Sequence, residues 1–378
     1  MNLQHGIYAI CLLAALASDF ALADESIFDG ALKIERPKIA NIISLKSTSI
    51  YFATNRKISE ETIEISSRNY ENGYNLSLID YNKIFSNEVG ADIAIGQALV
   101  DFPAERQLAD QTYSPGSYAD NPLKNFSLVS VAFTGESGIW RDNVIGTKGE
   151  SFGKDVLVYV HGFVTTFSTA ASEAAQLKND LDFGGPIVLF SWPSDIGYFN
   201  YSEAIRREKI SSDYLSAVFN VLMQLGKTGK DSNPLPKEEL IAHSLGASLA
   251  LDTLFSLHNI WHSMGVKLNT LILAAADVNL TKFSFRDLPI INDYAYKTDL
   301  LCSDSDRALL LAQYMNPEDP PGQRLGRCFS ESSSFRRPEL DIYHFNGPLK
   351  DYEGHSYYLY DVNTLGNIKD QIANPLKR

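Results

Sequence analysis

The chain has 378 residues, of which 44% are apolar, and it carries a formal charge of −13. The length suits one large α/β domain or two smaller ones, and the apolar content excludes a largely disordered chain. The acidic balance argues against a nucleic-acid partner, which would require a basic face.

The beginning of the chain has the pattern of a targeting segment. An apolar run over 7–17 has the length of a signal-peptide core, and a small-x-small cleavage site follows at 21–23. We therefore expect residues 1–23 to be a signal peptide and the protein to be exported, either periplasmic or secreted. Cleavage leaves two cysteines, Cys302 and Cys328. An oxidising compartment favours a disulfide between them over two buried free thiols.

The region before residue 150 shows few clear signals. We expect residues 24–45 to form a lead-in segment and residues 46–378 to form a single domain. Strands are predicted at 49–53, 91–102 (one long strand or a strand pair) and 126–133. Residues 57–90 are polar and are expected to form a long surface excursion with little structure. The whole interval 57–150 is expected to be a variable part with extra strands and loops.

From residue 155 onward, short apolar runs alternate with helical patterns. Strands are predicted at 155–160, 186–190, 240–242, 268–275 and 294–302, and helices at 166–181 and 202–225 and shortly after positions 244 and 306. Continuous apolar runs are typical of strands that are buried on both faces of a parallel sheet. The alternation predicts an α/β fold with a mainly parallel sheet and helices on both faces.

A possible nucleophile stands between one such strand and its helix. Ser244 follows the strand at 240–242, has small residues at Ala242 and Gly246, and precedes a helical apolar pattern. This is the sequence of a nucleophile elbow, in which a serine is exposed on a sharp strand-to-helix turn. The structural alternative is a serine that only caps the helix.

A serine nucleophile needs a base, and the base needs a carboxylate that orients it. In this architecture the chain order is serine, acid, histidine. His355 lies in a glycine-containing loop and is the favoured base, whereas His344 lies in a half-apolar run and is expected to be structural. Asp306, Asp304 and Asp277 compete for the role of the acid, because each follows the end of a predicted strand.

An acyl-transfer site also needs two backbone donors for an oxyanion. One donor is expected to be the N–H of Leu245, and the other the N–H of Phe163, with Gly162 allowing a close approach. His161 is then expected to pack or to form hydrogen bonds rather than to act as a base. This chemistry requires neither a cofactor nor a metal.

Several short motifs resemble those of a group of bacterial α/β-hydrolases of unassigned function, described as esterase- or lipase-like. They are Phe52-Ala53-Thr54-Asn55-Arg56, His161-Gly162-Phe163, Trp192-Pro193-Ser194, Ala242-His243-Ser244-Leu245-Gly246, Asp306-Arg307-Ala308-Leu309 and Gly354-His355-Ser356. The resemblance covers about residues 48–360. It implies an α/β-hydrolase fold with Ser244 as nucleophile, His355 as base and Asp306, rather than Asp277, as acid. It does not imply a substrate.

The leading hypothesis is an exported serine hydrolase that cleaves a carboxylic ester, or a thioester or amide, through an acyl-enzyme. Its expected partner is a small-molecule or lipid-like ester, and no transmembrane segment is predicted. The alternative is a non-catalytic envelope or binding protein that retains the fold.

Overall fold

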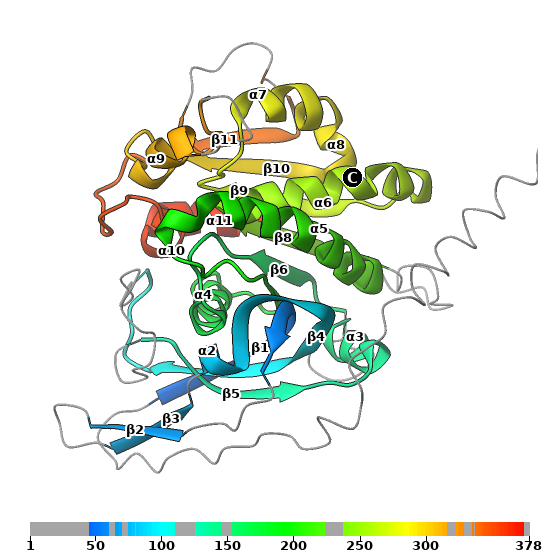
Figure 1. Cartoon of the computed structure of the whole chain (residues 1–378). Coiled ribbons are helices and arrows are strands. Elements are labelled where there is room, and N and C mark those ends of the chain that lie inside the picture. The colour runs from blue at the N-terminus through cyan, green and yellow to red at the C-terminus, as the bar shows by residue number, and fades with distance from the viewer. Residues whose placement is uncertain are drawn as a thin grey trace, which may run out of the picture.

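The computed structural model shows one mixed sheet covered by helices (Figure 1). It describes residues 45–59, 65–69, 75–79, 81–109, 125–145, 153–223, 237–315, 322–328, 335 and 337–373. The predicted signal peptide at 1–23 and all but the last residue of the lead-in segment at 24–45 lie outside these ranges. Within them, no helix combines the length and the apolar character that crossing a bilayer requires.

Nine strands form the sheet in the order β11-β10-β9-β8-β6-β7-β1-β4-β5, which runs from top to bottom in Figure 1. Their bounds are β1 Leu45–Ile58, β4 Phe85–Pro103, β5 Ser127–Phe133, β6 Val156–Val160, β7 Ile187–Ser191, β8 Glu238–His243, β9 Leu268–Ala274, β10 Ala295–Cys302 and β11 Leu340–His344. Neighbouring strands from β11 to β1 are parallel. Beyond β1 the pairing is antiparallel: β4 runs antiparallel to β1, and β5 runs antiparallel to β4. The predicted mainly parallel sheet is therefore confirmed.

The helices follow the strands in the expected alternation. They are α2 Tyr81–Ile84, α3 Ser137–Ile145, α4 Phe167–Asp180, α5 Tyr201–Met223, α6 Leu245–Met264, α7 Leu280–Lys282, α8 Ile291–Tyr294, α9 Arg307–Met315, α10 Tyr357–Tyr360 and α11 Val362–Ala373. Short helical turns η2 Tyr198–Asn200, η4 Phe283–Asp287 and η5 Leu288–Ile290 lie between them. Because parallel strands need crossover connections, this alternation follows directly from the parallel pairing.

Successive side chains of each central strand are buried on opposite faces of the sheet, as strand geometry requires. In β6, Val158 packs in one apolar cluster and Tyr159 in a second one. The first cluster contains side chains of α3, α5 and α6, and the second contains side chains of α4, α10 and α11. Helices therefore cover both faces, and the central strands are inaccessible to solvent on both sides.

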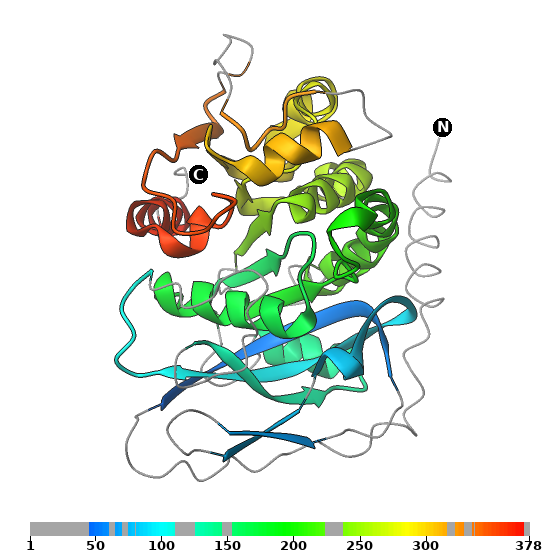
Figure 2. The ribbon, with the colours of Figure 1, turned by 60° about the vertical axis from the view of Figure 1, so that its left-hand side comes forward.

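The polar region at 57–90 is more ordered than its sequence predicts, so that prediction is wrong. β1 extends to Ile58, and β4 already begins at Phe85. Between them in the sequence, the chain forms a separate antiparallel pair of strands (Figure 2). That pair consists of β2 (Ile65–Asn69) and β3 (Asn75–Ile79). Each of its strands has only five residues, which is too short for a period-2 pattern to stand out from the polar residues around it.

Candidate active site

The serine turn predicted at the end of β8 is present. Ser244 has φ +55°, a left-handed value that is uncommon for a residue with a side chain and is typical of functional sites. Its N–H donates to the carbonyl of Ala274 (3.0 Å), and its own carbonyl accepts from the N–H of Asp277 (3.0 Å). The neighbouring end of β9 therefore holds the turn in this conformation.

Gly246 makes the close approach of α6 to the sheet possible. A Cβ at this position would lie 2.3 Å from the carbonyl oxygen of His161 and 2.9 Å from that of Val160. Both contacts involve backbone atoms, which cannot rotate away as a side chain can. The small residue that the sequence pattern required is therefore required by the backbone of β6 and its following loop.

Replacing Gly246 by alanine should destabilise the protein by about 1–3 kcal/mol, as overpacking of a buried site does. Thermal unfolding measures this effect. The control is Gly366→Ala in α11, where an added Cβ meets no atom within 4 Å and alanine is the better helix former. The expectation is contradicted if Gly246→Ala unfolds at the wild-type temperature or above it.

The histidine favoured as base forms a hydrogen bond with one of the competing aspartates. Nδ1 of His355 lies 2.7 Å from Oδ2 of Asp306. Asp306 is 1% exposed, and its other oxygen accepts from the N–H of Leu309 (2.8 Å) at the start of α9. The loop of His355 is held by Asp351, whose Oδ2 accepts from the backbone N–H groups of His355 and Ser356 (2.9 Å each). Gly354, with φ +63°, provides the turn before it.

Charges around the imidazole decide its protonation. Burial lowers the pKa of His355, but the carboxylates of Asp306, Asp277 and Asp351 raise it more, and the net result is a pKa above the usual 6.5. Because Nδ1–H donates to Asp306, Nε2 is the nitrogen left for proton transfer. The imidazole is thus oriented as a base with stabilised positive charge.

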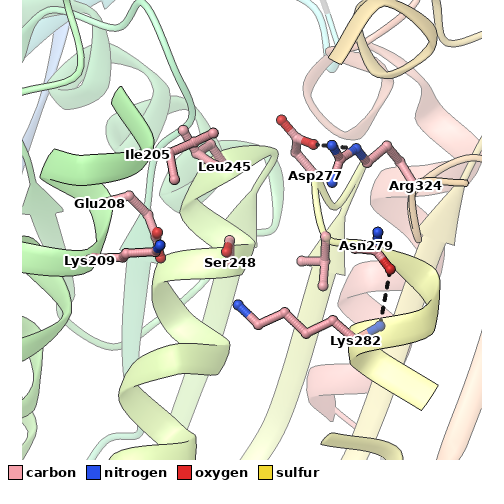
Figure 3. A pocket seen from close by; sticks show the side chains of 10 residues that line it. Ile205, Glu208, Lys209, Leu245, Ser248, Asp277, Asn279, Lys282 and Arg324 are labelled. Carbon is pink, nitrogen blue, oxygen red and sulfur yellow. Dashed lines mark hydrogen bonds and ion pairs between the residues drawn. The ribbon is translucent and has the colours of Figure 1, made fainter. Parts of the chain in front are cut away.

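Asp277 lines the same cavity of the structure as Ser244 and His355 but has other partners. Its carboxylate accepts a short hydrogen bond from the hydroxyl of Tyr201, and Oδ1 lies 3.3 Å from Nε of Arg324. Figure 3 shows this ion pair at one side of a small polar pocket. Burial raises the pKa of Asp277 even though Arg324 opposes the shift. Among the described residues, the hydrogen-bonded partner of the His355 imidazole is Asp306 and not Asp277.

Ser244 and His355 both line a cavity of about 410 Å³. No hydrogen bond joins the Ser244 hydroxyl to the imidazole within the part of the chain that the structure describes. Such catalytic contacts are often long in unliganded enzymes and shorten when substrate binds. The structure therefore places the two groups in one cavity without joining them.

The two expected backbone donors flank Ser244. Phe163 lies in the loop after β6 and lines the cavity, and Leu245 is the first residue of α6. Neither N–H has a hydrogen-bond partner among the described residues. Gly162 allows the loop to pass close to the turn, since a Cβ there would lie 3.0 Å from the Cβ of Ser244.

The other histidines have structural partners. His161 is fully buried, and burial together with the nearby Arg56 cation lowers its pKa to about 3. His243 is also buried, which lowers its pKa well below 6.5, and its Nε2 donates to the carbonyl of His355 (3.3 Å). His344 ends β11 and does not line the cavity.

The predicted disulfide between Cys302 and Cys328 is confirmed. It attaches segment 322–328, which includes Arg324, to the end of β10. Ser303 N–H donates to the carbonyl of Gly326 (3.0 Å) in the same region. The loop after β10, which contains Asp306, is therefore cross-linked to the segment that forms the ion pair with Asp277.

A sheet of this topology, with a serine on a strained strand-to-helix turn, defines an α/β hydrolase. The family of alpha/beta hydrolases of unknown function (DUF900) matches residues 142–344, just over half of the chain, and the protein belongs to that family. The match contains Ser244 and Asp306 and ends before His355. No curated protein is similar enough to the chain to count as a match.

Proposed function

We propose that the protein is an exported serine hydrolase that cleaves a carboxylic ester through an acyl-enzyme. The observation that carries the proposal is the presence of Ser244, at positive φ, and the hydrogen-bonded His355–Asp306 pair at one cavity. A mere helix cap would not need this backbone conformation or an imidazole beside it.

Each residue has a defined role in the proposed reaction. Ser244 Oγ attacks the carbonyl carbon while Nε2 of His355 takes the hydroxyl proton, and the N–H groups of Leu245 and Phe163 bind the resulting oxyanion. Collapse of the tetrahedral intermediate breaks the bond to the alcohol oxygen, which receives the proton from His355. Water then repeats the sequence on the acyl-enzyme and releases the acid. Asp306 accepts the hydrogen bond from Nδ1 and stabilises the imidazolium.

Labelling with a fluorophosphonate tests the proposal directly, because an activated serine attacks the phosphorus of this probe, displaces fluoride and becomes phosphonylated. The expected result is stoichiometric labelling of the wild type at Ser244, identified by mass spectrometry of the labelled peptide. Folded protein that neither labels nor hydrolyses any ester would instead support the alternative, a non-catalytic binding protein on the same fold.

Export is the second part of the proposal. It is supported by the apolar run at 7–17 and by the Cys302–Cys328 disulfide, since disulfides persist mainly in oxidising compartments. Fractionation of cells that express the full chain, with N-terminal sequencing of the product, tests it. A cytoplasmic product that retains residues 1–23 would contradict it.

The activity should depend on pH through His355. A protonated imidazole cannot accept the serine proton, so activity is lost as the pH falls through the pKa of His355, which Asp306 and its neighbours raise above 6.5. We expect kcat/KM to rise through one ionisation above pH 6.5 and then to level off. A profile that is flat between pH 6 and 9 would exclude His355 as the base.

The cavity wall indicates the kind of ester. Helix α9 contributes an apolar stretch to the wall, namely Leu309, Leu311, Ala312 and Met315. Apolar walls stabilise bound hydrocarbon in proportion to the area that they cover. We therefore propose that α9 contacts the aliphatic part of the substrate.

Enlarging Ala312 should narrow this part of the cavity. In Ala312→Phe, kcat/KM for p-nitrophenyl octanoate should fall about tenfold or more relative to the acetate, since steric changes of one or a few methylenes have effects of this size in apolar pockets. The matched control is Leu310→Phe on the same helix, because Leu310 does not line the cavity. If the ratio of kcat/KM for octanoate to that for acetate is equal in the two variants, α9 does not contact the aliphatic part of the substrate.

A further inference from the structure

Arg56, at the end of the Phe52–Arg56 motif, has no role in the acyl-transfer steps. It is 2% exposed, and among the described residues no carboxylate forms an ion pair with its guanidinium. Burial lowers the pKa of Arg56 to about 9. Asp195 stabilises the charge only through the longer-range Coulombic interaction. A buried cation without a direct ion pair is costly, so its contacts need an explanation.

The guanidinium of Arg56 donates to three groups, which lie at the end of β7, in the loop after β6 and at the start of β4. Nε donates to Ser191 Oγ (2.9 Å), Nη2 donates to the carbonyl of Thr165 (2.6 Å), and Nη1 donates to the carbonyl of Ser86 (3.4 Å). Thr165 lies near the end of the loop that begins at His161. The Oγ of Ser194 accepts from the N–H of Thr165 (3.2 Å) and donates to its carbonyl (3.1 Å). Arg56 and Ser194 therefore hold the far end of the loop that carries Phe163.

The near end of the loop is held through His161. Its Nε2 accepts from the backbone N–H of Trp192 (3.1 Å) and lies 3.2 Å from Ser191 Oγ, the oxygen to which Arg56 donates. A backbone N–H can only donate, so the imidazole proton must be on Nδ1. Nδ1–H then donates to the carbonyl of Gly162 (2.9 Å).

The hydrogen bond from His161 to the carbonyl of Gly162 fixes the orientation of the Gly162–Phe163 peptide as well as its position. The carbonyl of Gly162 and the N–H of Phe163 belong to one planar trans peptide and point in opposite directions. Holding the carbonyl on His161 therefore directs the N–H of Phe163 away from it. A chain of hydrogen bonds from Arg56 through Ser191 to His161 thus ends at the peptide that the proposed function uses for the oxyanion.

We propose that Arg56 is a positioning residue that, through Ser191 and His161 and through Thr165, fixes the direction of the Phe163 N–H in the oxyanion hole. This inference rests on the proposed function. It assigns a role to the end of β1, a strand that contributes no residue to the cavity wall within the described part of the chain.

Arg56→Lys tests the proposal, because lysine keeps the charge but cannot make the forked contacts to Ser191 and Thr165 together. We expect kcat to fall about 10²-fold with KM changed less than threefold, the effect of losing one oxyanion donor. Affinity for an aryl trifluoromethyl ketone, which forms a tetrahedral oxyanion on serine, should fall by the same factor as kcat/KM. A purely structural role would lower the amount of folded enzyme without changing kcat per active site, which fluorophosphonate titration counts.

Arg106→Lys is the matched control. Its guanidinium is also buried, but it pairs with Asp180 of α4, which takes no part in the contacts that link Arg56 to Phe163. It should lower the unfolding temperature and leave kcat per titrated site unchanged. If Arg56→Lys fails to fold, Ser191→Ala decides, since it removes only the bridging hydroxyl and is expected to lower kcat about tenfold.

The inference is overturned if folded Arg56→Lys has the kcat and ketone affinity of the wild type. If that variant does not fold, the same result in Ser191→Ala overturns it. Either result leaves the esterase proposal intact. A wild type that neither labels with fluorophosphonate nor hydrolyses esters overturns the proposed function instead. The two failures are therefore distinguishable.

Discussion

Replacing Ser244 by alanine should lower kcat for p-nitrophenyl ester hydrolysis by about 10⁴-fold or more and abolish fluorophosphonate labelling. The loss is this large because alanine lacks the oxygen that attacks the carbonyl carbon, so the acyl-enzyme cannot form at this position. The residual rate should reflect only binding and the oxyanion donors. The fold should tolerate the change apart from the positive φ of this residue, for which alanine is no worse than serine.

Ser248→Ala provides the matched control. Ser248 lies near the start of the same helix but lines the small polar pocket of Figure 3 instead of the cavity that Ser244 and His355 line. Its removal should leave labelling and kcat unchanged. Activity of Ser244→Ala within tenfold of wild type would mean that another side chain, or water directly, attacks the ester.

The parallel half of the sheet could be predicted from the sequence because its strands are buried on both faces. Runs such as 155–160 and 268–275 contain almost only apolar residues, and the structure places strands there within about a residue. The strand pair β2–β3 and helix α3 were not predicted, because their amphipathic signals are weak. The C-terminal helix α11 was not predicted either, although Leu365 and Ile368 pack in the core.

The site was predictable to a different degree. The position of Ser244 follows from a local pattern of small residues around a turn, and local patterns survive in the sequence. The choice between Asp306 and Asp277 depends on which carboxylate reaches the imidazole of His355 much further along the chain, and spacing alone left it open. The hydrogen bonds around Arg56 could not be predicted either, because they join side chains from three strand ends that lie far apart in the sequence.

The structure turns the choice of acid into a second prediction with a large effect. Asp306→Asn should lower kcat by about 10⁴-fold. The N–H of Leu309 already takes one oxygen of residue 306 at the start of α9. The asparagine oxygen would keep that bond, so its NH₂ group would face Nδ1 of His355. Nδ1 would then have to accept, the proton would move to Nε2, and the imidazole could no longer take a proton from Ser244.

Asp277→Asn is the matched comparison, and it should lower kcat by less than about tenfold. Its carboxylate serves Tyr201 and Arg324, and it acts on His355 only through its charge. Removing that charge should lower the pKa of His355 and move the rising limb of the pH profile to lower pH. Measuring kcat and the pH profile of both variants with one ester separates the two roles. A larger loss in Asp277→Asn than in Asp306→Asn would reassign the acid, because an acid that fixes the tautomer must cost more to neutralise than one that only adds charge.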